Sequence, residues 1–113
     1  MKDYPHVEEP TLEEMKEGFH LKGKWKETFF KNGNPLVLEL GCGMGEYSVG
    51  LAEKYPNKNF VGVDIKGARI WQGATESLEK GMKNVGFLRI RIDWIESCFE
   101  KEEVDEIWIT FPD

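Results

Sequence analysis

The chain has 113 residues, 40% of them hydrophobic, and a formal net charge of −6. These values fit one globular domain and argue against wholesale disorder. The acidic balance disfavours a nucleic-acid site made by this chain alone, because Lys and Arg dominate phosphate binding. No apolar run approaches the ~20 residues that cross a bilayer, and the acidic N-terminus does not resemble a signal peptide. Cys42 and Cys98 form no metal-ligand spacing, and a cytoplasmic protein is expected.

The N-terminal third is expected to form an arm and helices, over residues 1–35. Prolines and charges over residues 1–10 predict a loose arm. Thr11, with Glu14 three residues later, has the pattern of a capping box and predicts the start of a helix. A second helical stretch is expected over 23–31, before Asn32-Gly33-Asn34-Pro35 breaks the chain.

Strand and helix patterns then alternate, which predicts right-handed βαβ units and a parallel sheet with helices on both faces. This is a Rossmann-like α/β fold over residues 36–113, with the carboxyl ends of its strands as the ligand-binding edge. The expected strands are 36–40, 60–63, 85–92 and 104–111, and the expected helices are 46–54, 67–80 and a short one over 94–99. The pattern stops after the fourth strand, so a longer natural chain is expected.

Helical spacing also predicts which helix faces meet the sheet. In the first helix of the alternating region the candidates are Tyr47, Leu51 and Tyr55. In the second they are Trp71, Ala74, Thr75 and Leu78.

The most informative motif is Glu39-Leu40-Gly41-Cys42-Gly43-Met44-Gly45, an acidic strand end followed by a G-x-G-x-G turn. Gly41, Gly43 and Gly45 would let a ligand approach the backbone without meeting a Cβ. The spacing differs from the G-x-G-x-x-G turn that holds a pyrophosphate. S-adenosyl-L-methionine has no phosphate but has an ammonium group, which Glu39 could face. The alternative is a tight turn that binds no ligand.

Two further acidic residues close the next strands. Asp64 could accept both ribose hydroxyls of an adenosine, and Asp93 could accept a hydrogen bond from the adenine amino group while Trp94 packs on the ring. Each aspartate could instead be the N-cap of the following helix. The fourth strand ends at Phe111-Pro112-Asp113, where Asp113 could hold a nitrogen nucleophile, or the strand could simply pass into a loop.

Together these segments resemble the bacterial tRNA (guanine-N7)-methyltransferase family. The resemblance is carried by residues 39–47, Gly62-Val63-Asp64, Asp93-Trp94 and Phe111-Pro112-Asp113, with Leu21-Lys22-Gly23-Lys24-Trp25 before the first strand. It covers residues 21–113. The glycine motif alone is common to many methyltransferases. Its combination with Phe111-Pro112-Asp113 and with the segment around Lys24-Trp25 is what points to this particular family.

The resemblance implies a class I fold that binds S-adenosyl-L-methionine through Glu39, Asp64 and Asp93, with Asp113 in the active site. It also implies that the guanosine site and the basic surface for tRNA lie mainly in residues that this chain lacks. The 113 residues alone are therefore expected to be inactive. Neither a bound metal nor a membrane association is expected.

The expected chemistry is simple. Guanine N7 has a lone pair and no proton, so its methylation needs positioning rather than a general base, and a carboxylate such as Asp113 suits the positive charge that develops. Two other hypotheses remain open, namely a methyltransferase for another nitrogen substrate (a protein amide or a base amine) and a non-catalytic nucleotide-binding module.

Structural roles are expected for the remaining notable residues. Cys42 is interpreted as a small turn residue, Cys98 as a core or half-buried residue and Trp25 as a packing anchor. His6 and His20 are expected at the surface, and residues 100–103 are expected to form a solvated loop.

Overall fold

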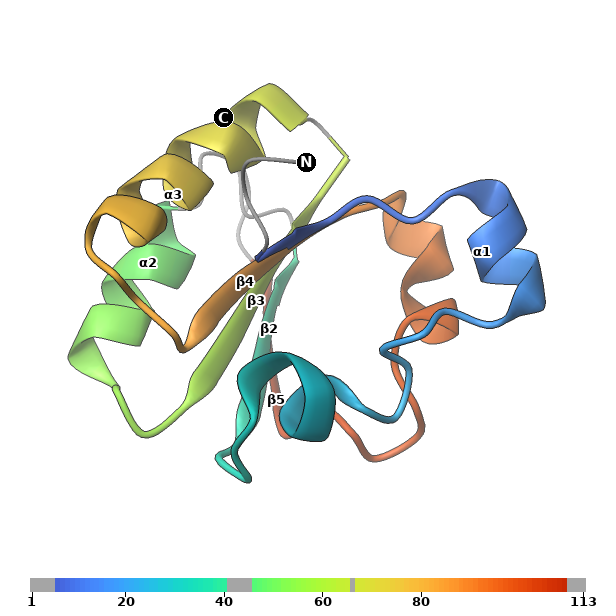
Figure 1. Cartoon of the computed structure of the whole chain (residues 1–113), viewed down its shortest axis with the longest axis horizontal. Helices are drawn as coiled ribbons and strands as arrows, with labels where there is room; N and C mark the ends of the chain where they lie inside the picture. Colours follow the sequence, from blue (N-terminus) through green and yellow to red (C-terminus); the bar gives the residue numbers. More distant parts are fainter. Residues whose placement is uncertain (1–5, 41–45, 66, 110–113) are drawn as a thin grey trace.

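A five-stranded, fully parallel sheet forms the centre of the molecule in the computed structural model, which describes residues 6–40, 46–65 and 67–109. Its strand order is β1-β4-β3-β2-β5 (Figure 1). The strands are β1 (Val7–Glu8), β2 (Leu36–Leu40), β3 (Asn59–Asp64), β4 (Val85–Arg89) and β5 (Glu106–Ile109). The predicted parallel α/β sheet is therefore confirmed.

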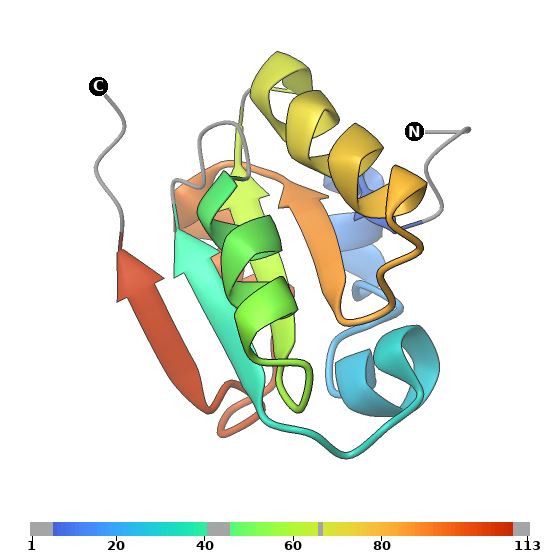
Figure 2. The ribbon, with the colours of Figure 1, turned by 90° about the vertical axis from the view of Figure 1, so that its left-hand side faces the viewer.

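Two helices cover one face of this sheet. α2 (Glu46–Lys54) joins β2 to β3, and α3 (Gly67–Glu79) joins β3 to β4. Figure 2 shows both helices in front of the strands that they connect. Successive crossovers in the same direction put their helices on the same face when each is right-handed. The core on this side contains Val7, Val37, Val49, Ala52, Phe60, Ile70, Ala74, Val85 and Phe87.

The helix bounds match the expectation closely, and the predicted buried stripes are right in part. Ala74 of α3 is buried as predicted, but Trp71 and Leu78 are 48% and 46% exposed, and Ile70 and Ser77 are buried instead. Leu51 of α2 packs against the core as predicted, whereas Tyr55 just beyond the helix is 40% exposed. The residues that pack in the core beside the sheet are Val49, Ala52, Ile70 and Ala74.

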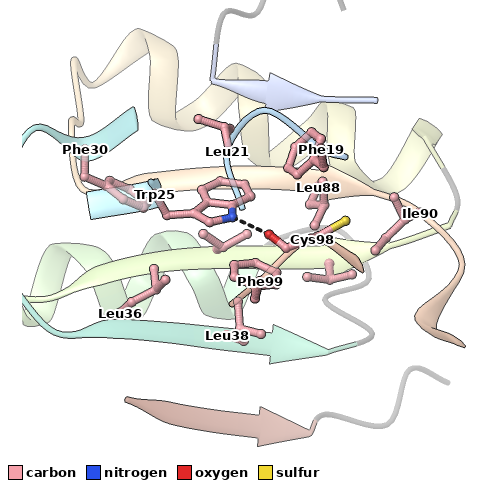
Figure 3. Close-up of a cluster of buried hydrophobic side chains, with 12 residues drawn as sticks. Phe19, Leu21, Trp25, Phe30, Leu36, Leu38, Leu88, Ile90, Cys98 and Phe99 are labelled. Atoms are coloured by element: carbon pink, nitrogen blue, oxygen red, sulfur yellow. Dashed lines mark hydrogen bonds between the residues drawn. The ribbon is translucent and has the colours of Figure 1, made fainter. Parts of the chain in front are cut away.

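The opposite face is covered by the N-terminal segment and by the connection from β4 to β5. This connection runs back across the sheet, so a right-handed path puts it on the face without α2 and α3. The core here contains Phe19, Leu21, Trp25, Phe30, Leu36, Leu38, Val61, Val63, Leu88, Ile90, Cys98 and Phe99 (Figure 3).

Trp25 is the centre of this second core and is fully buried. Its indole Nε1 donates a 2.8 Å hydrogen bond to the carbonyl of Cys98, and its ring stacks on Phe99 with centroids 5.0 Å apart (Figure 3). The indole N–H thus has the partner that a buried tryptophan requires. Trp25 as a packing anchor and Cys98 as a core residue are both confirmed.

The two helices expected before the sheet are present. α1 (Leu12–Glu17) begins at a capping box, in which the Glu14 backbone N–H donates to Thr11 Oγ1 at 3.2 Å. The second is a π-helix, η1 (Trp25–Phe30), shorter than the predicted 23–31. Gly86 of β4 makes room for it, because a Cβ there would lie 2.6 Å from the Phe29 ring.

The loose arm predicted for residues 1–10 is wrong for its described part. Val7 and Glu8 form β1, which pairs with Phe87 and Leu88 of β4. The expected surface position of His6 is right only in part, because its side chain is part-buried. Its Nε2 lies 3.1 Å from the carbonyl of Ala74 and 2.9 Å from Ser77 Oγ. A two-residue edge strand is fixed by its partner rather than by its own sequence pattern, so local reasoning missed it.

The end of the described chain differs from expectation in four places. β4 stops at Arg89 rather than at residue 92, and the short helix expected over 94–99 is the 3-10 helix η2 (Ile92–Ser97). β5 covers only Glu106–Ile109 of the predicted 104–111, of which 110 and 111 lie outside the described residues. The loop over 100–103 is not merely solvated. The Glu103 carboxylate accepts hydrogen bonds from the backbone N–H groups of Gly23, Trp25 and Glu100.

Candidate cofactor site

The carboxyl ends of β2 and its neighbours define the candidate site. From β2 the chain passes outward through β3 to β4, and it then returns to place β5 on the other side of β2. Such a reversal of strand order is where open α/β sheets bind ligands, outside the carboxyl ends of the strands. Glu39 and Asp64, on adjacent strands, both lie at this edge.

Glu39 is almost completely buried, with 1% of its surface exposed. It pairs with Gly62 on β3 and Trp108 on β5. Its Oε1 accepts a hydrogen bond of 2.5 Å from the hydroxyl of Ser48, on the first turn of α2. A carboxylate withdrawn from bulk water attracts a cationic group more strongly than an exposed one. This property suits a ligand ammonium group.

Asp64 is the last residue of β3 and is 7% exposed. Its carbonyl accepts a hydrogen bond of 3.1 Å from the backbone N–H of Ile90, next to the β3–β4 ladder. α3 begins only at Gly67, so Asp64 is not its N-cap residue. The β3–β4 ladder therefore fixes the backbone of Asp64 at the carboxyl edge of the sheet.

Asp93 and Trp94 lie in η2 and not at a strand end. The N-cap of η2 is Arg91 and Asp93 is in its first turn, so the alternative N-cap role is wrong for Asp93 as well. Its carboxylate is exposed and lies 3.2 Å from Nη2 of Arg91. Trp94 is half-buried and packs against the core cluster around Trp25. The placement leaves the Asp93 carboxylate accessible to a ligand.

The remaining predicted site residues lie outside the described residues. These are Gly41, Gly43, Gly45 and Asp113. Their roles, and the cofactor contacts of Glu39, Asp64, Asp93 and Trp94, stay predictions. Cys42, expected to be a small turn residue, also lies outside the described residues.

Two residues at the site were missed by the sequence reasoning. Ser48 holds the Glu39 carboxylate, and a hydroxyl on the buried face of a helix just after an acidic strand end is a signal that could have identified it. Arg89 ends β4 opposite Asp64, and its guanidinium contacts both Ile65 and Glu9. No local pattern could have identified Arg89, because both of its partners are distant in sequence.

The described parts of the chain offer neither a metal site nor a membrane-spanning helix. Residues 6–40, 46–65 and 67–109 contain no group of three or more His, Cys, Asp or Glu residues arranged to hold a metal ion. In the same ranges, no helix has the length and apolar character needed to span a membrane.

The parallel sheet, its strand order and its helices define a Rossmann-like α/β protein. The structure of PKMT2 from Rickettsia typhi in complex with AdoHcy superposes with a TM-score of 0.57 at 26% identity, over 67% of this chain and 14% of that one. A family model described as "Putative methyltransferase" matches residues 33–113. Since this match covers most of the chain, the chain belongs to this methyltransferase family.

Curated relatives agree with this assignment and extend it toward the N-terminus. A protein of Christiangramia forsetii named tRNA (guanine-N(7)-)-methyltransferase is 59% identical over 111 residues, which are 97% of this chain and 50% of that protein. One of Bacteroides fragilis with the same name is 60% identical over 114 residues, covering 100% of this chain and 45% of that protein. The chain thus spans about half the length of these relatives.

Proposed function

We propose that this chain is the cofactor-binding part of an S-adenosyl-L-methionine-dependent methyltransferase that forms N7-methylguanosine in tRNA. The observation that carries the proposal is the 59% and 60% identity, over nearly the whole chain, to two proteins named for this activity. The AdoHcy complex of the similar Rickettsia typhi structure supports the choice of cofactor. Residues 36–113 would hold the cofactor, and residues 1–35 would support them.

The described residues fit this cofactor. Glu39, buried at the end of β2, would attract the ammonium group of the methionine moiety. Asp64, next to it on β3, would accept the ribose hydroxyls. The exposed Asp93 carboxylate would accept the adenine amino group, with Trp94 beside the ring. Bound there, the cofactor supplies a methyl group on a sulfonium sulfur.

The residues contributed by this chain have a positioning task rather than a proton-transfer task. Guanine N7 carries a lone pair and no proton, so no general base is needed. The enzyme must align N7 with the methyl group and stabilise the positive charge that arrives on the base. We assign that stabilisation to Asp113, at the end of Phe111-Pro112-Asp113.

The tRNA itself would be held mainly by residues beyond this chain. The net charge of −6 gives these 113 residues little attraction for phosphates. The other half of the relatives' length would therefore carry the basic surface. A tRNA substrate would place the whole protein in the cytoplasm.

The decisive experiment uses the full-length protein, unmodified tRNA and labelled S-adenosyl-L-methionine. Nucleosides are separated after complete digestion. We expect label in 7-methylguanosine, and its loss in the Asp113→Ala variant while cofactor binding persists. Binding is measured separately by calorimetry with S-adenosylhomocysteine.

Two other results would contradict different parts of the proposal. Label in a protein or in another base, with tRNA guanosine unlabelled, would overturn the substrate and retain the cofactor. An Asp64→Asn variant that binds S-adenosylhomocysteine as tightly as the wild type would overturn the assigned ribose contact.

A further inference from the structure

The Arg89 guanidinium joins two segments at the carboxyl edge of the sheet. Its Nε donates a hydrogen bond of 3.0 Å to the carbonyl of Ile65, and its Nη1 donates one of 3.1 Å to Oε2 of Glu9. Arg89 is the last residue of β4 and pairs with Asp64 in the β3–β4 ladder. It therefore lies beside the predicted ribose carboxylate but belongs to a different strand.

Arg89 binds the Ile65 carbonyl just beyond the end of the β3–β4 ladder. The carbonyl of Asp64 is held by the backbone N–H of Ile90. The next carbonyl, that of Ile65, accepts from the Arg89 side chain instead. The Ile65 side chain is 51% exposed, so burial contributes little to fixing this residue. The charged hydrogen bond extends backbone order one residue beyond the strand, and such bonds are stronger than neutral ones.

The second contact fixes the guanidinium itself. Glu9 directly follows β1, the short edge strand that pairs with β4. A flexible arginine loses side-chain entropy when it is held in one geometry, and the Glu9 carboxylate on its other side offsets this loss. The N-terminal segment thereby supports a loop that is distant from it in sequence.

We propose that Arg89 is a positioning residue for the cofactor: its guanidinium fixes the backbone after Asp64 and so orients the Asp64 carboxylate toward the ribose. The inference rests on the proposed function for the identity of the ligand. Arginine is suited to this task because its planar fork presents several donors in fixed directions. Lysine keeps the charge but cannot reproduce that geometry.

The test uses the full-length protein with Arg89→Ala and Arg89→Lys. Lys80→Ala is the matched control, since Lys80 and Arg89 side chains are both 47% exposed and both form ion pairs. Lys80 pairs with Glu53 and Glu76. It directly follows α3, on the way to the amino end of β4, and is therefore remote from the carboxyl ends of the strands. Binding of S-adenosylhomocysteine, KM and kcat at saturating tRNA, and thermal unfolding are measured for each variant.

We expect Arg89→Ala to raise the dissociation constant and the cofactor KM about tenfold, the equivalent of one charged hydrogen bond. The kcat at saturating cofactor should stay within about twofold, because the methyl-transfer geometry is set elsewhere. Arg89→Lys should resemble Arg89→Ala, and Lys80→Ala should resemble the wild type. A purely stabilising role for Arg89 would lower the melting temperature without this split between KM and kcat.

Two failures can be told apart. If the wild-type protein binds no S-adenosylhomocysteine, the proposed function falls and the inference falls with it. If the wild type binds it and Asp64→Asn weakens binding, but both Arg89 variants match Lys80→Ala, the inference alone is overturned.

Discussion

The hydroxyl of Ser48 donates a hydrogen bond of 2.5 Å to Oε1 of Glu39 and joins the first turn of α2 to the buried end of β2. Both side chains are withdrawn from water, Ser48 completely and Glu39 to 1% exposure. A carboxylate in such a place depends on its donors, since burying a charge without hydrogen bonds is costly. The relationship makes Ser48 a structural requirement of the predicted ammonium site.

Replacing Ser48 by alanine should therefore destabilise the protein. Loss of one donor to a buried charged acceptor costs about 1–3 kcal/mol. Urea unfolding of the full-length protein measures the change. Ser97→Ala makes the same chemical change at an exposed position of η2 and should have little effect. Equal stability of the two variants would show that the Ser48–Glu39 bond contributes nothing.

Glu103 is predicted to be a second structural carboxylate. Its oxygens accept backbone hydrogen bonds from Gly23 and Glu100 at 2.8 Å each and from Trp25 at 3.1 Å. Glu103→Ala should lower the free energy of unfolding by about 2 kcal/mol or more, because three backbone donors lose a charged partner. The control is Glu96→Ala, at an exposed position of η2. A loss no larger than that of the control would refute the prediction.

Cys98 should be an inert thiol in the folded protein. Burial raises the pKa of the Cys98 thiol from 9.0 to about 12, so little thiolate is available as a nucleophile. We expect peptide mass mapping to find Cys98 unlabelled by iodoacetamide at mildly alkaline pH, and labelled after unfolding. Rapid labelling under native conditions would contradict its burial.

The same shift predicts a loss of stability at high pH. The thiol keeps its proton to a higher pH in the folded protein than in the unfolded chain. Its contribution to the free energy of unfolding is therefore fully present below pH 9.0 and declines as the pH rises toward about 12. The decline is at most about 1.4 kcal/mol per pH unit. Comparing urea unfolding of the wild type and Cys98→Ala across this range isolates it, and identical pH profiles would exclude it.

For His6 we predict the opposite pH dependence, a loss of folding stability at low pH. Burial lowers the pKa of His6 from 6.5, and the hydrogen bond to the Ala74 carbonyl opposes this only in part. The unfolded state therefore binds a proton first, and the contribution of His6 to stability is lost as the pH falls below 6.5. His6→Gln, which keeps a hydrogen-bond donor, should remove this part of the acid sensitivity. Urea unfolding across this pH range measures the effect, and an unchanged profile in His6→Gln would contradict the prediction.

Much of the architecture followed from the sequence alone. The apolar runs that became β2 and β3, the glycine and proline breaks between elements, and the capping box at Thr11 are local signals with local physical causes. The alternation of strands and helices then required a parallel sheet with right-handed connections. Glu39 and Asp64 could be assigned to one edge, because parallel strands present their carboxyl ends on the same side.

The tertiary structure decided what depends on distant partners. β1 exists because Val7 and Glu8 pair with β4, and η1 fits against that strand because Gly86 has no side chain. Packing against the sheet decided the buried face of α3, where Ile70 is buried and Trp71 is 48% exposed. The contact of Arg89 with Ile65 and Glu9 joins residues 24 and 80 positions away in sequence. A sequence pattern records periodicity within an element, whereas these contacts arise only when separate elements pack together.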